Sequence, residues 1–497
     1  MTKNTFLKNT FFINTSIIIL SGFIIKILGL INKIIITRYL GTNGMTLYIM
    51  SFPTIILFLN IATMNINNSV SKMISESQIT KKYSPKIILK KALKITLFSS
   101  TFTIILLIII IKPLTTILLK NPMLIWPLMT TIFLIPLTCI SDCLKGYYNG
   151  LKQMSKTTIA NLLEQITRII FTIISLVILL PHGIIISATF TILSLSFGEF
   201  CSVIYLLKKI KKENLTDFPC NNPTKQLLAI SVPTTISKLI GSLTYFLEPI
   251  TYTFILTKLN YSSEIIQTNY TIINAYSLPL LTTASFISIA LATTVIPSIS
   301  ENYAAKRMHN IKYLIDKVII FSLIPSLLIS ILLYFYPNEL MKLIYDTTSG
   351  TTFIKPFVFF FLLYYLQMPF SSILQAIGKT KVPFIFTTIF SFLRIILIII
   401  LAYIPRIGIN CIFYAIFFTM IMHSLTMIFL VFKYTNYQVN YVNLCSLFLI
   451  TAITICFSII LNNIFSNFIF NSMIISLIFL FLCYTFNLID IKSLKKS

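Results

Sequence analysis

The chain has 497 residues, of which 56% are hydrophobic and only 10% are charged, and its mean hydropathy is +0.90. This composition excludes an ordinary soluble domain. The formal net charge is +26, but the lysines and arginines fall between long apolar stretches. A membrane surface therefore explains them better than nucleic acid does, and no nucleic-acid partner is expected.

Apolar stretches of about twenty residues recur along the chain, each long enough to cross a hydrocarbon core of about 30 Å. They do not alternate as barrel strands do, and backbone groups inside lipid must be paired within their own segment, so the stretches are predicted helices. We predict an all-α polytopic membrane protein with about 14 transmembrane helices. These lie near residues 11–37, 45–71, 88–111, 123–147, 157–180, 184–207, 227–256, 268–297, 312–336, 354–377, 382–403, 407–432, 442–463 and 468–488.

The connections between these spans are alternately rich and poor in basic residues. The rich set includes SKMISESQITKKYSPK, LKGYYNGLKQMSK, KKIKKENLTDF and the C-terminal KSLKKS, whereas the opposite set carries few lysines or arginines. By the positive-inside rule the rich set is cytoplasmic. Both termini are then cytoplasmic, which requires an even number of spans.

Short motifs return in the same order after about 212 to 226 residues. The matching pairs are KILG at 26–29 with KLIG at 238–241, ISE at 74–76 with ISE at 299–301, and Gly150 to Arg168 with Ala376 to Arg394. Each copy holds about six predicted helices, so the copies face the same way and a cavity is expected between them. We predict two parallel six-helix lobes, at 1–212 and 226–435, followed by two additional helices at 440–490.

The first helix of each predicted lobe carries a small and polar stripe that contains positive charge. Helical spacing places on one face Gly22, Lys26, Gly29 and Lys33 in the first lobe, and Thr234, Lys238, Gly241, Tyr245 and Glu248 in the second. Lys26 lies roughly 22 Å along its helix from Phe11, at about 1.5 Å per residue. An ammonium group facing lipid there would cost at least about 2.5 to 3.5 kcal/mol.

We therefore expect the stripe to face water or protein in the cavity between the lobes. The candidate substrate-binding residues are Lys26, Lys33, Arg38, Lys238 and Glu248. Cations outnumber the carboxylate in this set, and an excess of positive charge at low dielectric favours an anionic ligand. Two other interpretations stay open: Lys26 pairs with Glu248 in a structural role, and Lys33 and Arg38 extend to the outer interface.

Other charged residues lie within predicted spans and have structural or ion-coupling interpretations. Glu164 and Arg168 are four residues apart, in the order that suits an intrahelical ion pair. Arg394 is the repeat counterpart of Arg168, but Phe390 replaces the glutamate, so Arg394 needs another partner or faces a cavity. Glu199 is expected to be buried and either paired or protonated, or to carry a coupling proton.

Nothing in the sequence indicates an enzyme. No nucleophile, base and acid form a recognisable set. The segment Gly378-Lys379-Thr380 resembles the end of a phosphate loop, but residue 373 is isoleucine where that motif requires glycine. The eight cysteines show no metal-binding spacing. We expect no cofactor, and the sequence does not identify a coupling ion.

Several longer blocks together resemble one family. The blocks are RYLGTNGMTLYIMSFP, KGYYNGLKQMSKTTIANLLEQITR, ISVPTTISKLIGSLTYFLEP, IALATTVIPSISE and YYLQMPFSSILQAIGKTKVP. In the same order, from about Lys3 to Lys433, they are similar to the stage V sporulation protein B branch of the multidrug/oligosaccharidyl-lipid/polysaccharide (MOP) flippase superfamily. This Firmicute branch is close to the lipid II flippases and to polysaccharide biosynthesis and transport proteins.

The resemblance implies two six-helix lobes that work by alternating access in the bacterial cytoplasmic membrane. It also implies an undecaprenyl-pyrophosphate-linked cell-wall precursor as cargo and a groove for the lipid chain at the last two helices. Lys26, Lys33 and Lys238 match positions where this family is expected to have arginine. Lysine supplies the charge without the two-pronged geometry that grips a pyrophosphate.

The sequence thus predicts a flippase for a lipid-linked oligosaccharide of the lipid II kind, serving peptidoglycan, spore cortex or polysaccharide synthesis. The expected partners are that substrate and membrane lipid, with cell-wall synthesis enzymes as a further candidate. One alternative is an ion-coupled multidrug exporter of the same fold, which needs acidic residues in its cavity. The other is a non-transporting scaffold that recruits cell-wall synthesis enzymes through its cytoplasmic loops.

Overall fold

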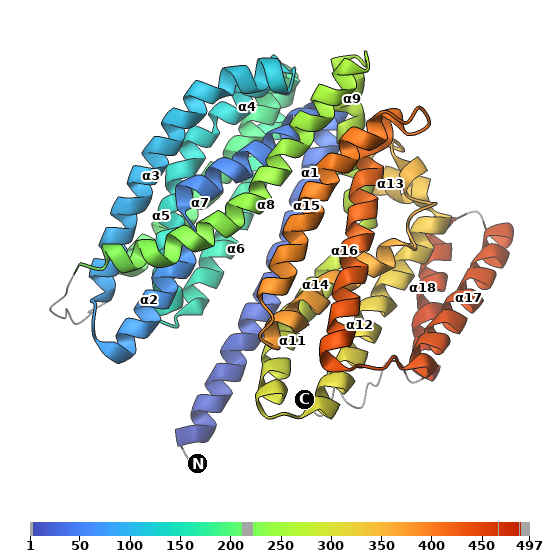
Figure 1. The fold of residues 1–497 in the computed structure, drawn as a ribbon. Coiled ribbons are helices and arrows are strands. Elements are labelled where there is room, and N and C mark those ends of the chain that lie inside the picture. The colour runs from blue at the N-terminus through green and yellow to red at the C-terminus, as the bar shows by residue number, and fades with distance from the viewer. Residues whose placement is uncertain (1–2, 211–221, 466, 487, 489–497) are drawn as a thin grey trace. The chain divides into compact units, whose positions relative to one another are not determined.

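The computed structural model describes residues 3–210, 222–465, 467–486 and 488, and every regular element in these ranges is helical (Figure 1). The C-terminal KSLKKS and most of the basic connection after residue 210 lie outside the described residues. The long helices are α1 (Lys3–Thr63), α2 (Ile66–Thr80), α3 (Pro85–Pro113), α5 (Thr131–Gly150), α6 (Met154–Leu179), α7 (Ile184–Ile210), α8 (Thr224–Lys258), α11 (Ser285–Ala304), α12 (Met308–Phe335), α14 (Phe361–Ala376), α15 (Lys381–Ala402), α16 (Cys411–Thr435), α17 (Tyr441–Ile464) and α18 (Phe468–Thr485).

Shorter helices join or extend these. They are η1 (Leu114–Leu118), η2 (Pro122–Leu124), α4 (Ile125–Met129), η3 (Leu180–His182), α9 (Ser263–Thr271), η4 (Ile272–Ser277), α10 (Leu278–Leu281), α13 (Pro337–Tyr345), η5 (Thr351–Phe353) and η6 (Gly408–Asn410). η1 and η4 are π-helical turns, and η4 sits inside a predicted span. That span is broken: its two parts, Ser263–Leu281 and Ser285–Ala292, meet at a bend of 61°.

The described chain has eleven helical stretches that are long and apolar enough to cross a membrane, or twelve if the bent pair is one span. The sequence predicts about fourteen, and two features account for the difference. Ile24–Gln78 is one helical stretch that contains two predicted spans, and Phe361–Ala376 has only 16 residues. The protein is an all-α, multi-pass membrane protein.

Gly41 separates the two predicted spans within α1. Its backbone has φ 59° and ψ −168°, whereas the helix continues on both sides of it. This left-handed φ is strained for residues with a Cβ and is freely adopted by glycine. A single glycine therefore kinks a helical stretch in which the sequence predicts two spans.

The chain packs as two compact units. Unit 1 contains Met1–Thr271 with Ile395–Cys411, and unit 2 contains Ile272–Arg394 with Ile412–Ser497. The units are defined by packing contacts, whereas the predicted lobes are defined by the repeated sequence motifs. One hydrogen bond is nevertheless found twice, once in each unit: the Ser75 hydroxyl donates to the Gly150 carbonyl at 3.1 Å, and the Ser300 hydroxyl donates to the Ala376 carbonyl at 3.2 Å.

In unit 1, α2, α3, α5, α6 and α7 surround a core of buried aliphatic and tyrosine side chains. Its members include Ile74, Ile88, Leu144, Tyr147 and Tyr148. Helices α2 and α5 approach closely because residue 146 is glycine. A Cβ added there would lie 2.6 Å from the carbonyl oxygen of Asn67, closer than two such atoms can come.

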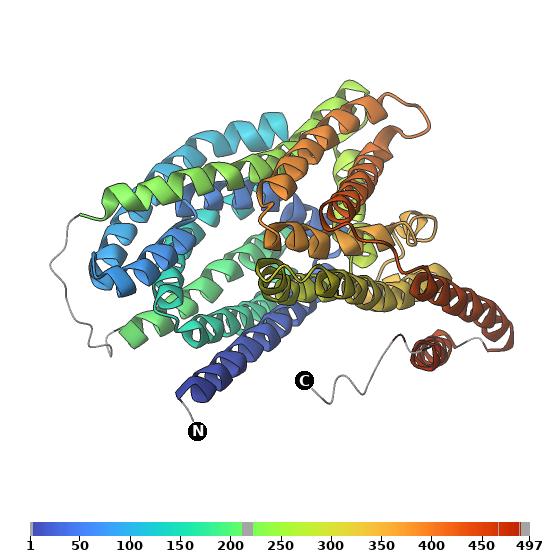
Figure 2. The same cartoon turned by 60° about the horizontal axis from the view of Figure 1, so that its bottom comes forward.

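In unit 2, α17 and α18 lie side by side and pack against α12 (Figures 1 and 2). Ile331, Ile475 and Phe479 are among the fully buried residues of this core. The Asn471 amide donates to the Phe465 carbonyl at 2.9 Å and so joins α18 to the end of α17. The last two predicted helices are thus a packed hairpin of unit 2.

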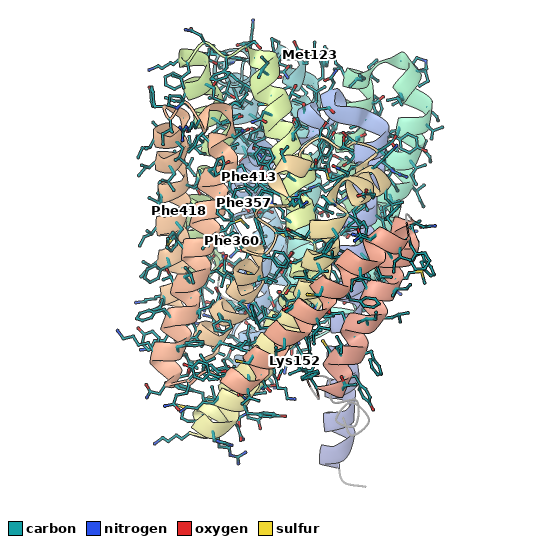
Figure 3. All side chains as sticks on the ribbon, turned by 90° about the vertical axis from the view of Figure 1, so that its right-hand side faces the viewer. Met123, Lys152, Phe357, Phe360, Phe413 and Phe418 are labelled. Atoms are coloured by element: carbon teal, nitrogen blue, oxygen red, sulfur yellow. The ribbon has the colours of Figure 1, made fainter. Side chains whose placement is uncertain are left out.

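Phenylalanines fill the space between α16 and the segment that precedes α14. The rings of Phe357 and Phe413 meet edge to face with centroids 5.1 Å apart, and Figure 3 shows them together. Phe418, on α16, is 43% exposed and points away from this cluster. Exposed apolar side chains of this kind suit a helix whose outer face contacts lipid.

Replacement of Gly146 by alanine is expected to destabilise the protein by about 1–3 kcal/mol, because the new methyl group would force α2 and α5 apart. The thermal midpoint of the purified protein in detergent measures this. Gly29→Ala is the matched control, since a Cβ at Gly29 meets no atom within 4 Å. An unchanged midpoint for Gly146→Ala would show that α2 and α5 do not pack as described.

Candidate functional site

Helices α1 and α8 pack against each other within unit 1 and carry all five predicted substrate-binding residues. Lys26 and Arg38 on α1 and Lys238 on α8 are exposed, and Lys33 is partly buried. Glu248 differs from the others because it is buried, with 2% of its surface exposed. The structure therefore places most of the cations at accessible positions and the carboxylate in the interior.

The predicted small-residue stripe is open. A Cβ added at Gly22, at Gly29 or at Gly241 would meet no atom within 4 Å. Lys26, Lys33 and Arg38 extend along about 18 Å of α1, at about 1.5 Å per residue. All three precede the break at Gly41, so they lie on one continuous helical segment.

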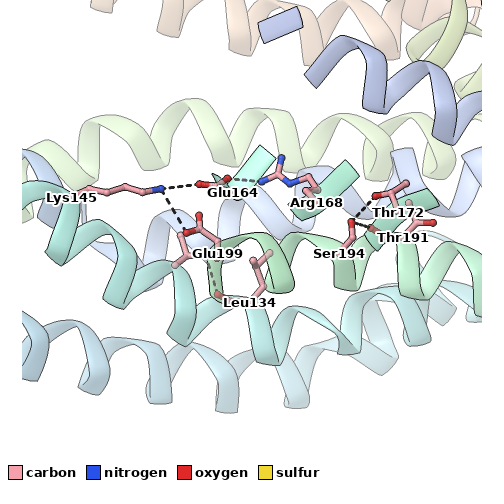
Figure 4. Close-up of polar contacts among 9 residues, drawn as sticks. Leu134, Lys145, Glu164, Arg168, Thr172, Thr191, Ser194 and Glu199 are labelled. Atoms are coloured by element: carbon pink, nitrogen blue, oxygen red, sulfur yellow. Dashed lines mark hydrogen bonds and ion pairs between the residues drawn. The ribbon is translucent and has the colours of Figure 1, made fainter. Parts of the chain in front are cut away.

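A second group of charges lies inside unit 1, where α5, α6 and α7 meet (Figure 4). Lys145 of α5 donates from Nζ to Glu164 Oε2 at 2.9 Å and lies 3.7 Å from Glu199 Oε2 of α7. Arg168 donates from Nη2 to Glu164 Oε1 at 2.7 Å, which is the intrahelical pair that the spacing predicts. Glu164 and Glu199 are 8% and 9% exposed, so both carboxylates need these cations.

Asp142 adds a third carboxylate one turn before Lys145. The Asn67 amide donates to its Oδ1 at 3.5 Å, and Lys145 lies three residues further along the same helix. The buried site thus brings together three carboxylates, Asp142, Glu164 and Glu199, and two cations, Lys145 and Arg168.

The local sequence brings α6 and α7 close enough for these contacts. Gly198 precedes Glu199, and a Cβ at this position would lie 2.8 Å from the Glu164 carbonyl oxygen. Further along the same pair of helices, the Thr172 hydroxyl donates to Ser194 Oγ at 3.0 Å (Figure 4). Small and hydroxyl-bearing residues are what allow membrane helices to approach and to bond across their contact.

Sequence reasoning missed Lys145 and Asp142. Lys145 belongs to the basic segment LKGYYNGLKQMSK, which the positive-inside pattern assigns to a cytoplasmic connection, but α5 continues to Gly150 and carries Lys145 inward. The spacing of Asp142 and Lys145, three residues apart within a predicted span, could have signalled a polar helix face. It could not have shown which helix supplies the partners.

Arg394 does not join this cluster. It lies on α15 in unit 2, where its Nε donates to the Thr419 hydroxyl at 3.3 Å. His423, one turn further along α16, accepts from the Gln367 amide at Nδ1, 2.8 Å away, and is 7% exposed. Arg394 and His423 line the same cavity in unit 2.

Replacement of Lys145 by methionine is expected to destabilise unit 1 by about 3–5 kcal/mol, because two buried carboxylates lose their shared cation. Thermal midpoints in detergent test this against Lys86→Met, which changes an exposed lysine of α3. Adding Glu164→Gln and Glu199→Gln to the Lys145 variant should recover part of the loss. A Lys145 variant as stable as the wild type would mean that the cluster is not charged as described.

The comparisons with known proteins agree with this architecture. The sequence matches the family "Polysaccharide biosynthesis protein" over residues 11–303 and MatE over residues 273–404. Stage V sporulation protein B of Bacillus subtilis (strain 168) is 30% identical over 419 residues, covering 82% of this chain and 80% of that protein. Lipid II flippase MurJ of the same organism is 24% identical over 400 residues, or 74% of this chain and 73% of that one.

Two solved structures show the same fold. Lipid II flippase MurJ in an inward closed conformation aligns with a TM-score of 0.66 at 17% identity, covering 94% of this chain and 98% of that one. An inward-facing multidrug resistance MATE family transporter of the MOP superfamily aligns with a TM-score of 0.60 at 14% identity, covering 83% of this chain and 94% of that one. The chain therefore belongs to the polysaccharide biosynthesis protein family within the MOP superfamily, and it is a membrane transporter related to stage V sporulation protein B, not an enzyme.

Proposed function

We propose that this chain is a flippase that carries an undecaprenyl-pyrophosphate-linked cell-wall precursor, of the lipid II kind, from the inner to the outer leaflet. The supporting observation is the pair of exposed lysines, Lys26 and Lys238, on the packed helices α1 and α8. Both helices fall in stretches apolar enough to cross a membrane. Exposed cations within membrane-spanning segments favour an anionic ligand over a lipid environment.

In this mechanism the pyrophosphate binds first to Lys26 and Lys238. Lys33 and Arg38 then provide further cations along α1 toward the outer side, so the anion is not released into an apolar passage. A membrane potential that is negative inside favours outward movement of an anion by about 2.3 kcal/mol per charge per 100 mV. Glu248 limits the positive charge of the site.

We also propose the arrangement of helices that the internal repeat implies. Fourteen spans form two parallel six-helix lobes that alternate between inward and outward access, and α17 with α18 provides a groove for the lipid chain. Spore cortex, vegetative peptidoglycan and polysaccharide synthesis all present this class of substrate. Wall-synthesis enzymes would be partners only through the cytoplasmic loops.

The double variant Lys26→Ala, Lys238→Ala is expected to lose flipping of lipid II in proteoliposomes by at least about tenfold, because two charge-assisted contacts to the pyrophosphate are removed. Lys90→Ala with Lys86→Ala is the matched control, since both are exposed lysines of α3. The thermal midpoint of each variant is measured in parallel, so that a folding defect is distinguished from a loss of binding. Full flipping by a stably folded double variant would refute the assignment.

The exporter of cationic drugs is less well supported than the flippase. Such an exporter needs accessible carboxylates, whereas Glu164 and Glu199 are held in ion pairs and Glu248 is buried. Binding of lipid II, undecaprenyl phosphate and a cationic dye to the purified protein separates the alternatives. Preference for the dye would favour the exporter, and binding of none of the three would favour the scaffold.

We also propose that both termini face the cytoplasm. The basic ends of α2 and α7, with Lys81, Lys208 and Lys209, support this through the positive-inside rule. Reporter fusions test it: a reporter active only in the cytoplasm should work when joined after Ser497 and fail when inserted at Gly183. The reverse pattern would invert the orientation.

A further inference from the structure

Unit 2 contains a cavity of about 630 Å³ between α14, α15 and α16, with both apolar and polar side chains in its lining. Its polar lining includes Gln367, Ser371, Gln375, Thr387, Arg394 and His423. A volume of this order suits a small organic ligand. The flippase mechanism above uses none of these residues.

The cavity occupies the place in unit 2 that corresponds, by sequence repetition, to the buried charge cluster of unit 1. An offset of 226 residues relates Gly150 to Ala376, whose carbonyls accept matching serine hydroxyl bonds. The same offset relates Asp142 to Met368, Lys145 to Ser371, Glu164 to Phe390 and Arg168 to Arg394. All four counterparts in unit 2 line the cavity. In unit 1, charged side chains occupy all four positions. In unit 2, uncharged residues occupy three of the four, and a cavity lies beside them.

Of the four related positions, only one carries a charged residue in both units: Arg168 in unit 1 and Arg394 in unit 2. In unit 1 the carboxylate of Glu164 lies 2.7 Å from Arg168. In unit 2 Phe390 occupies the corresponding position, and no Asp or Glu is among the described residues that line the cavity. The cavity therefore carries a positive charge, to which an anionic group of a ligand is complementary.

Hydrogen bonds hold the cavity wall in a defined arrangement. The Gln367 amide donates from Nε2 to His423 Nδ1 at 2.8 Å, and its Oε1 accepts from the Ser424 hydroxyl at 3.3 Å. The other ring nitrogen of His423, Nε2, lies 3.5 Å from the Thr387 hydroxyl. Phe390 stacks on the His423 ring, with centroids 5.4 Å apart and planes at 25°.

We propose that this cavity binds a carboxylate-bearing polar group of monosaccharide or dipeptide size. Arg394 binds the carboxylate in the place that Glu164 takes beside Arg168. The amides of Gln367 and Gln375 and the hydroxyl of Ser371 bond to hydroxyl or amide groups of the ligand, and the Phe390 ring covers an apolar face. One guanidinium neutralises the single charge of a carboxylate, whereas a phosphate dianion would leave a negative charge unmatched in the cavity.

Saturation-transfer NMR on the full chain in lipid nanodiscs tests the proposal with four probes: glucuronate, N-acetylalanine, glucose and inorganic phosphate. We expect glucuronate or N-acetylalanine to bind, with glucose and phosphate at least about tenfold weaker, because glucose brings no charge to the arginine and phosphate brings more charge than one guanidinium neutralises. Preference for glucuronate identifies a sugar acid as the ligand, and preference for N-acetylalanine identifies a peptide carboxylate. Arg394→Gln should weaken the preferred probe by the same factor.

Phe390→Glu tests the role of Arg394 more directly. It recreates the Glu164–Arg168 pair of unit 1 four residues before Arg394, so it should abolish probe binding in a protein that stays folded. Arg406→Gln, which changes an exposed arginine after α15, is the matched control and should bind as the wild type does. Equal binding by wild type and folded Arg394→Gln, absence of binding by both carboxylates, or tighter binding of phosphate would each overturn the proposal. Lipid II flipping is measured separately, because this site does not depend on Lys26 or Lys238.

Discussion

A charge inside a membrane-spanning bundle must be matched, and in unit 1 Lys145 supplies that match. One ammonium group holds carboxylates from two other helices, at 2.9 Å from Glu164 and 3.7 Å from Glu199. The close approach of α6 and α7 at Gly198 makes this geometry available. Three helices of unit 1 are therefore joined through one ammonium group.

The two groups of charges in unit 1 differ in their surroundings. In the cluster, cations and carboxylates neutralise each other in a buried site, which favours a particular packing of three helices. Along α1 and α8, Lys26 and Lys238 are exposed beside glycines that leave open space. A soluble or lipid-linked anion can bind only where positive charge lies beside open space. The exposed lysines of α1 and α8 meet this condition, whereas the buried and paired charges of the cluster do not.

Hydropathy alone predicts most helices well, because each span is a continuous apolar stretch whose length the membrane dictates. The span predicted at 88–111 corresponds to α3, Pro85–Pro113. The number of spans is predicted less accurately. The two spans predicted on either side of Gly41 form one kinked helical stretch, Ile24–Gln78, and Phe361–Ala376 has only 16 residues. Among the charges, spacing predicts the pair on α6, Glu164 and Arg168, but not their partners on α5 and α7. Those contacts depend on helix packing, which a local pattern does not contain.

The distribution of the cluster over three helices has a consequence for how the protein is made. Asp142 and Lys145 enter on α5, Glu164 and Arg168 on α6, and Glu199 on α7. A helix inserted alone would leave ionised groups in lipid, at about 2.5–3.5 kcal/mol for each residue near its centre. We therefore expect α5, α6 and α7 to settle in the membrane together, because each helix supplies charges that neutralise those of the others.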